Sequence, residues 1–183
     1  TLSAFSAVET ACVVVNAAQG VEYGTRRMME VAKARGLCRV LVVNRIDAEP
    51  GKLAALIAQL REEFGPECLP INLPAKGGSA VVDCFFSPEG DSDVEDVGAA
   101  HQRIIDQVVE INETVMGRYL EEGEAGLSGQ DLHDAFEQCL REGHLVPICF
   151  VSARTGAGVK ELLDLAEKLF PSPLEGNPPQ FVR

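Results

Sequence analysis

Three short runs of apolar, largely β-branched residues constrain the fold of this chain more than any other feature. They cover residues 11–17 (ACVVVNA), 39–44 (RVLVVN) and 145–151 (LVPICFV). Runs of this length and composition are typical of strands that are buried on both faces of a parallel sheet. Segments with helix-forming composition or an apolar stripe at helical spacing follow these runs, at residues 22–35, 52–64 and 159–170. This alternation predicts an α/β fold with a parallel sheet and flanking helices.

The alternation stops between residues 66 and 144. Short extended runs at 69–73 and 80–86 predict small antiparallel strands in this stretch. Apolar residues at helical spacing predict one long helix over about 97–122 and another helix over 129–142. The predicted organisation is therefore a core at 1–65 and 145–170, an inserted α+β subdomain at 66–144 and a linker at 171–183.

The net charge of −12 is concentrated in one block. Residues 66–144 hold 17 acidic and 4 basic side chains, whereas the rest of the chain holds 11 acidic and 12 basic ones. An acidic block does not bind the nucleic-acid backbone by itself, but it attracts a basic partner protein at long range. The alternative interpretation is a solvated surface that keeps the protein soluble.

Composition excludes several classes of protein. A chain of 183 residues buries a sufficient core without disulfides or a structural metal. The six cysteines form no C-x-x-C pair and the three histidines lack a metal spacing, so we expect buried free thiols, a reducing compartment and no metal site. No apolar run approaches the ~18 residues of a membrane helix, and no signal peptide is present, so we expect a cytoplasmic protein with no membrane partner. The first residue is Thr1 rather than Met, and we expect the chain to begin inside a longer protein.

The segment Asn44–Asp47 (N-R-I-D) follows directly after the second apolar run. Ligands of open α/β sheets bind outside the carboxyl ends of the strands. The Asp47 carboxylate can accept from the ring N1–H and the exocyclic amine of guanine together, a donor pair that adenine lacks. Asn44 can bond to the purine edge and brace the neighbouring loop, and the stem of Arg45 can lie across the base. Taken alone the motif is weak, because Asn and Asp are also common turn residues at strand ends.

The segment Ser152-Ala153-Arg154 has the equivalent position after the third apolar run. The backbone N–H of Ala153 can donate to the purine carbonyl, while Ser152 orders the loop. Because both segments end a predicted parallel strand, they are expected at the same edge of the sheet. Together they predict the base-recognition part of a guanine-nucleotide site.

The motifs resemble those of bacterial elongation factor G, a translational GTPase. Asn44–Asp47 resembles the N-K-x-D motif of that family, and Ser152-Ala153 resembles its S-A motif. Residues 7–15 look like the helix end and strand that follow the switch II region in that family. Further segments that recur in order in elongation factor G are 73–74, 81–83, 119–123, 146–148 and 170–173. The resemblance covers nearly the whole chain, and the insertion resembles the subdomain that distinguishes elongation factor G from other translational GTPases.

The resemblance implies a parent protein that binds GTP or GDP with Mg²⁺ and promotes translocation, or alternatively recycling, on the ribosome. It also implies that the acidic insertion docks onto a ribosomal stalk protein. Arg45 departs from the family, where Lys is usual, which indicates a divergent paralogue. A larger departure is that no G-x-x-x-x-G-K-[S/T] and no D-x-x-G segment is present. The chain therefore lacks the ligands for phosphate and Mg²⁺, and we predict that it does not hydrolyse GTP alone. By the same analogy, strand 11–17 becomes an exposed apolar edge that favours self-association.

Two other functions are compatible with the residues. The chain can be a nucleotide-free module whose acidic insertion captures a basic partner, which predicts no selectivity for guanine. It can also be an unrelated α/β enzyme that uses His133 with Asp134, or His144, in acid–base catalysis. Neither histidine has a nucleophile in a plausible turn nearby, so a role at the helix surface is the simpler interpretation.

Overall fold

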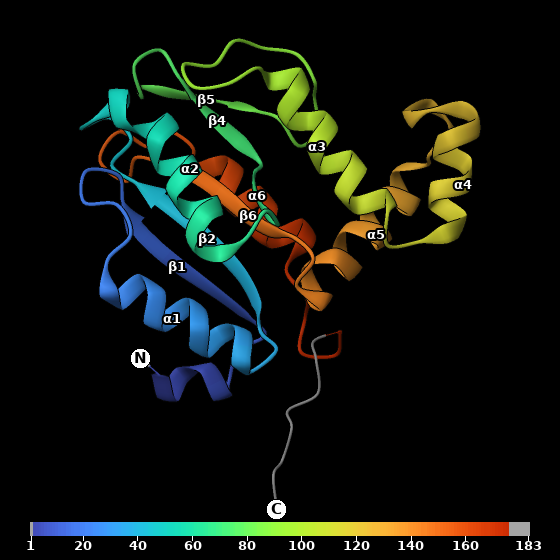
Figure 1. Cartoon of the computed structure of the whole chain (residues 1–183), viewed down its shortest axis with the longest axis horizontal. Coiled ribbons are helices and arrows are strands. Elements are labelled where there is room, and N and C mark those ends of the chain that lie inside the picture. Colours follow the sequence, from blue (N-terminus) through green and yellow to red (C-terminus); the bar gives the residue numbers. More distant parts are fainter. Residues whose placement is uncertain (1, 176–183) are drawn as a thin grey trace, which may run out of the picture.

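A four-stranded, fully parallel sheet forms the centre of the computed structural model, which describes residues 2–175 (Figure 1). The strand order is β1-β2-β6-β3, with bounds Thr10–Asn16, Cys38–Asn44, Val146–Val151 and Cys68–Pro70. This sheet confirms the predicted α/β class. The last part of the predicted linker, residues 176–183, lies outside the described residues.

The two central strands are the most apolar part of the molecule. Every residue of β6 and all of β2 except Asn44 are buried. Pro147 is tolerated inside β6 because β2 pairs with β6 only from Ile148 onwards, so no ladder bond to β2 needs the missing N–H. Burial on both faces explains why these strands have continuous rather than alternating apolar sequences.

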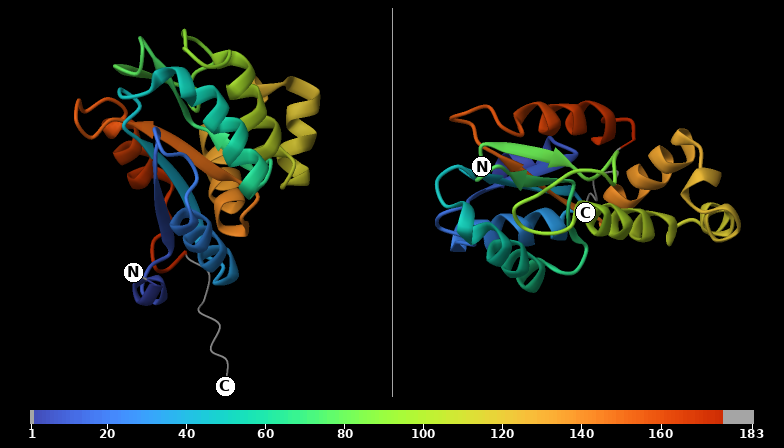
Figure 2. Two further views of the ribbon diagram at one scale, coloured as in Figure 1. Left: turned by 60° about the vertical axis from the view of Figure 1, so that its left-hand side comes forward. Right: turned by 90° about the horizontal axis from the view of Figure 1, so that it is seen from above.

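Three helices cover the two faces of the sheet. α1 (Tyr23–Ala34) and α2 (Leu53–Phe64) lie on one face, and α6 (Val159–Leu169) lies on the other, as Figure 2 shows. Their bounds agree with the predicted helices to within one residue. Gly36, with φ of 66°, follows the end of α1 in the left-handed conformation that glycine adopts at low cost.

β1 lies at one edge of the sheet, as predicted, but it is not buried on both faces. Buried and exposed residues alternate along the middle of β1, and Val14 is 61% exposed. The prediction of a doubly buried strand was wrong because no described element covers the outer part of this face. The same exposure corrects the prediction for the thiols, since Cys12 is exposed while the other five cysteines are buried and free.

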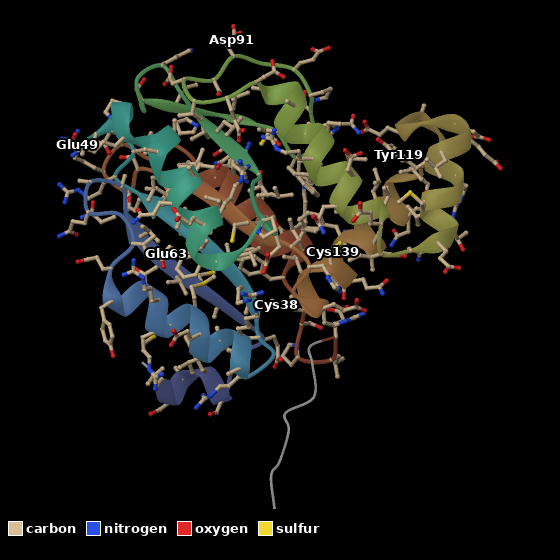
Figure 3. The ribbon with its side chains drawn as sticks, viewed as in Figure 1. Cys38, Glu49, Glu63, Asp91, Tyr119 and Cys139 are labelled. Carbon is tan, nitrogen blue, oxygen red and sulfur yellow. The ribbon has the colours of Figure 1, made fainter. Side chains whose placement is uncertain are left out.

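The insertion combines a small hairpin with three helices. β4 (Asn72–Ala75) and β5 (Ala80–Asp83) pair antiparallel, as predicted for this region. The helices that follow are α3, α4 and α5, with bounds Val97–Val109, Glu113–Glu122 and Gly129–Glu142. The side chain of Tyr119 joins α4 to α3, because its hydroxyl donates to Asp106 over 3.2 Å (Figure 3).

Two predictions for the insertion were wrong in part. The single helix over 97–122 is two helices, since Asn112 adopts an extended conformation and caps α4 by accepting from the N–H groups of Thr114 and Val115. The run 69–73 is not one antiparallel strand, because Cys68–Pro70 forms β3 and pairs parallel with β6 in the main sheet. β3 is thus part of the core sheet although it lies in the segment predicted as insertion.

None of the helices in the part of the chain that the structure describes is both long enough and apolar enough to cross a membrane.

Candidate nucleotide-binding site

The two predicted loops lie side by side at the carboxyl edge of the sheet. Asn44 is the last residue of β2 and pairs with Val151, the last residue of β6. Ser152 follows immediately, so the segments 44–47 and 152–154 begin at the same level on neighbouring strands. The structure therefore brings together all six residues that the sequence singled out: Asn44, Arg45, Asp47, Ser152, Ala153 and Arg154.

Asn44 links the two loops. Its Oδ1 accepts from the backbone N–H of Arg45 over 2.7 Å and from that of Ala153 over 3.0 Å. Ile46 adds a backbone bond, donating its N–H to the carbonyl of Val151 over 3.3 Å. The bracing role expected for Asn44 is thus present in the structure. The N–H of Ala153 is already bonded to Asn44, so it reaches a purine carbonyl only by exchanging or sharing this bond.

The Asp47 carboxylate is held from both sides. Ser152 Oγ donates to Asp47 Oδ1 over 2.5 Å, and Arg154 Nη2 lies 2.5 Å from Asp47 Oδ2. The hydrogen bond from Ser152, and then that from Arg154, hold the pKa of Asp47 below its usual value despite the opposing effect of burial. Asp47 is consequently an ionised acceptor at neutral pH. Its side chain is only 11% exposed, whereas that of Arg154 is 78% exposed.

Arg45 has an unusual backbone conformation for a residue with a side chain. Its φ is 67°, in the left-handed region, and the residue is exposed. The bond from its N–H to Asn44 Oδ1 helps to hold this conformation. Ile46 next to it is buried, whereas Arg45 is exposed to the solvent.

The loop after β6 closes on itself before α6 begins. Ser152 Oγ accepts from the N–H of Thr155 over 3.2 Å, and Ser152 N–H donates to the Ala157 carbonyl over 2.8 Å. Gly158, with φ of 73°, is packed so closely that a Cβ there would lie 2.0 Å from the carbonyl oxygen of Phe150. Sequence reasoning assigned no role to Gly158, although a glycine one residue before a predicted helix signals such a contact.

Sequence reasoning also missed a contact from the insertion. Gly78, in the turn between β4 and β5, is buried against the backbone of Ile46 and Asp47. The signal was the glycine pair Gly77-Gly78 between two short strands. Nothing in the sequence indicated which part of the molecule this turn would meet.

Two alternatives were predicted for an acid–base site: His133 with Asp134, and His144. His133 lines a largely apolar cavity of about 300 Å³ between the insertion and α6, together with His101, Phe86 and Lys168. His144 is exposed and lies 3.5 Å from Glu142. The cavity contains no residue of the two loops. Neither alternative therefore shares a residue with the candidate nucleotide site.

The donors and acceptors at the loops suit a base rather than a metal ion. Within residues 2–175, no group of three or more His, Cys, Asp or Glu side chains is placed to hold a metal. Asp47, the one carboxylate among the six site residues, is already bonded to Ser152 and Arg154. A single carboxylate among six residues is a poor site for Mg²⁺, whereas its two oxygens are the kind of acceptor pair that a planar ring with adjacent N–H donors requires.

Comparison with known proteins identifies the family. The family model described as the elongation factor Tu GTP binding domain matches residues 1–172. The chain belongs to this family. The resemblance to translational GTPases that the sequence motifs indicated is thereby confirmed.

Relatives within this family carry the names of translation factors. The chain is 26% identical to an elongation factor G-like protein of Mycobacterium tuberculosis, over 95% of the chain and 26% of that protein. It is 29% identical to an elongation factor G-like protein of Thermotoga maritima, over 88% of the chain and 25% of that protein. It is also 29% identical to peptide chain release factor 3 of Streptococcus pyogenes, over 93% of the chain and 34% of that protein.

A protein from Thermus thermophilus whose crystal structure is known has the same fold as this chain. The TM-score is 0.81 at 33% identity, over 95% of this chain and 28% of that one. The chain thus spans about a quarter to a third of the length of the proteins it matches.

Proposed function

We propose that this chain carries the guanine-recognition part of the nucleotide site of a ribosome-dependent GTPase similar to elongation factor G. The observation that carries the proposal is the convergence of Asp47, Asn44 and Ala153 at the carboxyl ends of two adjacent parallel strands. Membership of the GTP-binding domain family supports the same ligand.

Guanine recognition follows from the donors and acceptors at the two loops. The ionised Asp47 carboxylate accepts from the N1–H and the exocyclic amine of guanine, and Ser152 keeps one of its oxygens in place. The exposed Arg45 side chain covers the plane of the base. Adenine presents no matching donor pair, so the site rejects adenine nucleotides because Asp47 would lose its partners.

Hydrolysis belongs to a longer protein in this proposal. The chain spans 25–34% of its relatives, and no P-loop or D-x-x-G motif occurs in its sequence. We therefore expect the chain alone to bind the base without hydrolysing GTP. In the complete, cytoplasmic protein, GTP turnover stimulated by ribosomes would accompany translocation or a related step. Absence of ribosome-stimulated turnover in that protein would overturn this part.

The direct test is a titration of the chain with fluorescent GDP, with ADP as competitor. We expect ADP to compete at least about a hundredfold less well than GDP. Asp47→Asn is expected to weaken GDP binding by about a hundredfold and to favour xanthosine diphosphate, whose 2-carbonyl accepts from an amide. Asp91→Asn is the matched control, since Asp91 is exposed in the insertion, away from the core (Figure 3). A chain that binds neither nucleotide would favour the nucleotide-free interaction module, and equal competition by ADP and GDP would reject guanine recognition.

A basic protein partner is the second part of the proposal. The segment 66–144 has 13 more acidic than basic residues, and several of these acids are exposed on and around α4. Such a surface suits a basic face of a ribosomal stalk protein. Replacing Glu110, Glu113 and Glu121 by Lys is expected to reduce ribosome-stimulated turnover in the complete protein. The matched control reverses exposed acids of the core, Glu22, Glu62 and Glu167. Equal effects of the two triple variants would count against docking on the insertion.

Self-association is proposed through β1. Its outer edge pairs with no described strand, and Val14 projects from an uncovered face. Sedimentation of the chain is expected to show an apparent mass that rises with concentration, and Val14→Lys is expected to abolish this rise. Leu163→Lys is the control, because Leu163 on α6 is 63% exposed, nearly the same fraction as Val14. A wild-type chain that stays monomeric would reject the proposal.

A further inference from the structure

The turn between β4 and β5 joins the insertion to the guanine loop. Residues 76–79 form this turn, and Gly78 within it is buried. A Cβ added to Gly78 would lie 2.2 Å from the carbonyl oxygen of Ile46 and 3.2 Å from the Cα of Asp47. In Figure 1 the β4–β5 hairpin lies above the main sheet. The backbone of the insertion therefore touches the backbone of the residue that recognises guanine.

The turn is held rigidly enough to act as a support. Gly78 N–H donates to the Ala75 carbonyl over 3.1 Å within the hairpin. The Asp93 carboxylate accepts from Gly77 N–H over 2.8 Å, and the Asp93 N–H donates to the Pro74 carbonyl over 2.8 Å. The loop that leads to α3 thus clamps the hairpin at its turn and at the end of β4.

The start of the hairpin is bonded to β6, the strand that leads into the loop at 152–158. Asn72 is buried, and its side chain bonds Phe150 twice: Nδ2 donates to the Phe150 carbonyl over 3.1 Å, and Oδ1 accepts from the Phe150 N–H over 2.7 Å. Phe150 lies two residues before Ser152, and its carbonyl is also the group against which Gly158 packs. One hairpin is therefore connected to both loops of the site.

We propose that the β4–β5 turn positions the guanine loop, with Gly78 as the positioning residue, so that the insertion sets the affinity and selectivity of the base site. Only a glycine lets the turn approach the Ile46 carbonyl this closely while keeping a φ of 75°. A shift of the hairpin displaces Ile46 and Asp47 together, since their backbone is what it touches. The effect on nucleotide selectivity rests on the proposed function, whereas the mechanical connection between turn and loop does not.

The test compares two neighbouring glycines. Gly77 and Gly78 both have positive φ, 66° and 75°, but a Cβ on Gly77 meets nothing within 4 Å. Gly77→Ala therefore reproduces the backbone strain of Gly78→Ala without its clash. In the 183-residue chain, Gly78→Ala is expected to speed amide hydrogen exchange of Ile46 and Ala153 at least about tenfold relative to Gly77→Ala. Exchange that is equal in the two variants overturns the proposal.

A second readout follows selectivity, which a partly unfolded population does not change. Inosine diphosphate lacks the exocyclic amine that donates a hydrogen bond to Asp47 in the proposed complex. The ratio of GDP affinity to IDP affinity therefore reports the position of Asp47. Gly78→Ala is expected to lower this ratio about tenfold and Gly77→Ala to leave it unchanged. Suppose that the wild-type chain binds GDP and IDP equally well, while Gly78→Ala speeds amide exchange at Ile46 and Ala153. This result rejects the guanine site and supports the mechanical connection between the turn and the loop. A high wild-type ratio that Gly78→Ala leaves unchanged, with unchanged exchange, supports the site and rejects the connection.

A second pair of variants, with a smaller effect on the backbone, tests the proposal if Gly78→Ala does not fold. Asp93→Ala removes the acceptor that clamps Gly77, and Asp93 is exposed, so the fold does not depend on its burial. Asp91→Ala is the control in the same loop. We expect Asp93→Ala, but not Asp91→Ala, to speed exchange at Ile46 about threefold. No difference between these two variants would overturn the proposal.

Discussion

The two loops of the site are stabilised in different ways. The loop after β6, residues 152–158, is closed by its own bonds, from Thr155 N–H to Ser152 Oγ and from Gly156 N–H to the Ser152 carbonyl. The loop after β2 has Ala48 N–H bonded to the Arg45 carbonyl, but its position depends on partners outside it: Val151, Ser152, Ala153 and Gly78.

This difference separates the rigid from the adjustable part of the site. The loop after β6 is a fixed platform because it is braced within itself and by β6. The loop after β2 carries Asp47, which distinguishes guanine in the proposed function, and it is open to influence from the insertion. A substitution that disturbs the packing of the first loop is therefore expected to act on stability, and one that touches Asp47 or its loop to act on nucleotide binding.

The largest effect is expected from the platform itself. Gly158→Ala puts a methyl group 2.0 Å from the Phe150 carbonyl oxygen, whereas Gly156→Ala, at a φ of 85°, meets nothing within 4 Å. The strained backbone alone costs about 1–2 kcal/mol in either variant. The clash adds about 1–3 kcal/mol to the cost of Gly158→Ala. Urea denaturation measures the difference in the free energy of unfolding, and equal values for the two variants would mean that the loop is not packed as a platform.

The next effect concerns the bond that joins the loops. Ser152→Ala removes the hydroxyl that donates to Asp47, and we expect GDP binding to weaken about tenfold. Ser128 with Asp131 is a chemically matched pair at the start of α5, since Ser128 Oγ donates to Asp131 over 2.6 Å. Ser128→Ala is therefore the control that loses the same kind of bond far from the site. A tenfold loss in both variants would indicate general destabilisation.

The same two serines predict separate changes in two pKa values. Ser152 is the first cause of the lowered pKa of Asp47, and Ser128 is the first cause of the lowered pKa of Asp131. Ser152→Ala should raise the pKa of Asp47 only, and Ser128→Ala that of Asp131 only. A lowered native pKa contributes stability above the ordinary value near 3.9, and this contribution is lost as the pH falls through the native pKa. Each variant should thus protonate its carboxylate at a higher pH than the wild type, which NMR titration of the carboxyl carbons measures.

The sequence could predict the platform better than the adjustable loop, for a physical reason. Buried strands and amphipathic helices leave a local pattern, and the carboxyl ends of parallel strands necessarily meet at one edge. The six site residues therefore came together as expected. The contact of Gly78 with Ile46 depends on where an inserted hairpin folds back, and no local pattern records this.

The failed predictions have the same origin. Ile111 and Val115 continue the apolar spacing of α3 across the break at Asn112, so periodicity alone hides the cap that ends one helix and begins the next. β3 is three residues long and pairs with a strand far along the chain, so its sequence does not show that it belongs to the parallel sheet. The exposure of Val14 reflects what covers β1, which is not a property of β1 itself.

A smaller effect is expected from the exposed turn of the adjustable loop. Arg45→Ala removes the side chain that covers the base in the proposed complex, and a contact between a cation and a ring at an exposed site accounts for about a threefold change in affinity. Arg45→Lys keeps a cation on a long stem and should bind GDP within about twofold of the wild type. Competition titrations with GDP measure both. A loss in Arg45→Lys as large as that in Arg45→Ala would show that the planar guanidinium is needed.

The smallest effect tests whether Arg154, in the loop after β6, competes with the nucleotide for Asp47. Arg154 lies against Asp47 Oδ2, one of the two oxygens that guanine uses in the proposed complex, so we expect the base to compete with this ion pair. Arg154 is largely exposed, and exposed ion pairs are weak and screened by salt. Arg154→Ala should therefore bind GDP about twofold more tightly than the wild type at low salt, with the difference vanishing near about 1 M salt. If the variant instead binds GDP more weakly at every salt concentration, Arg154 is a ligand of the nucleotide rather than its competitor, and both loops then contribute a charged group to recognition.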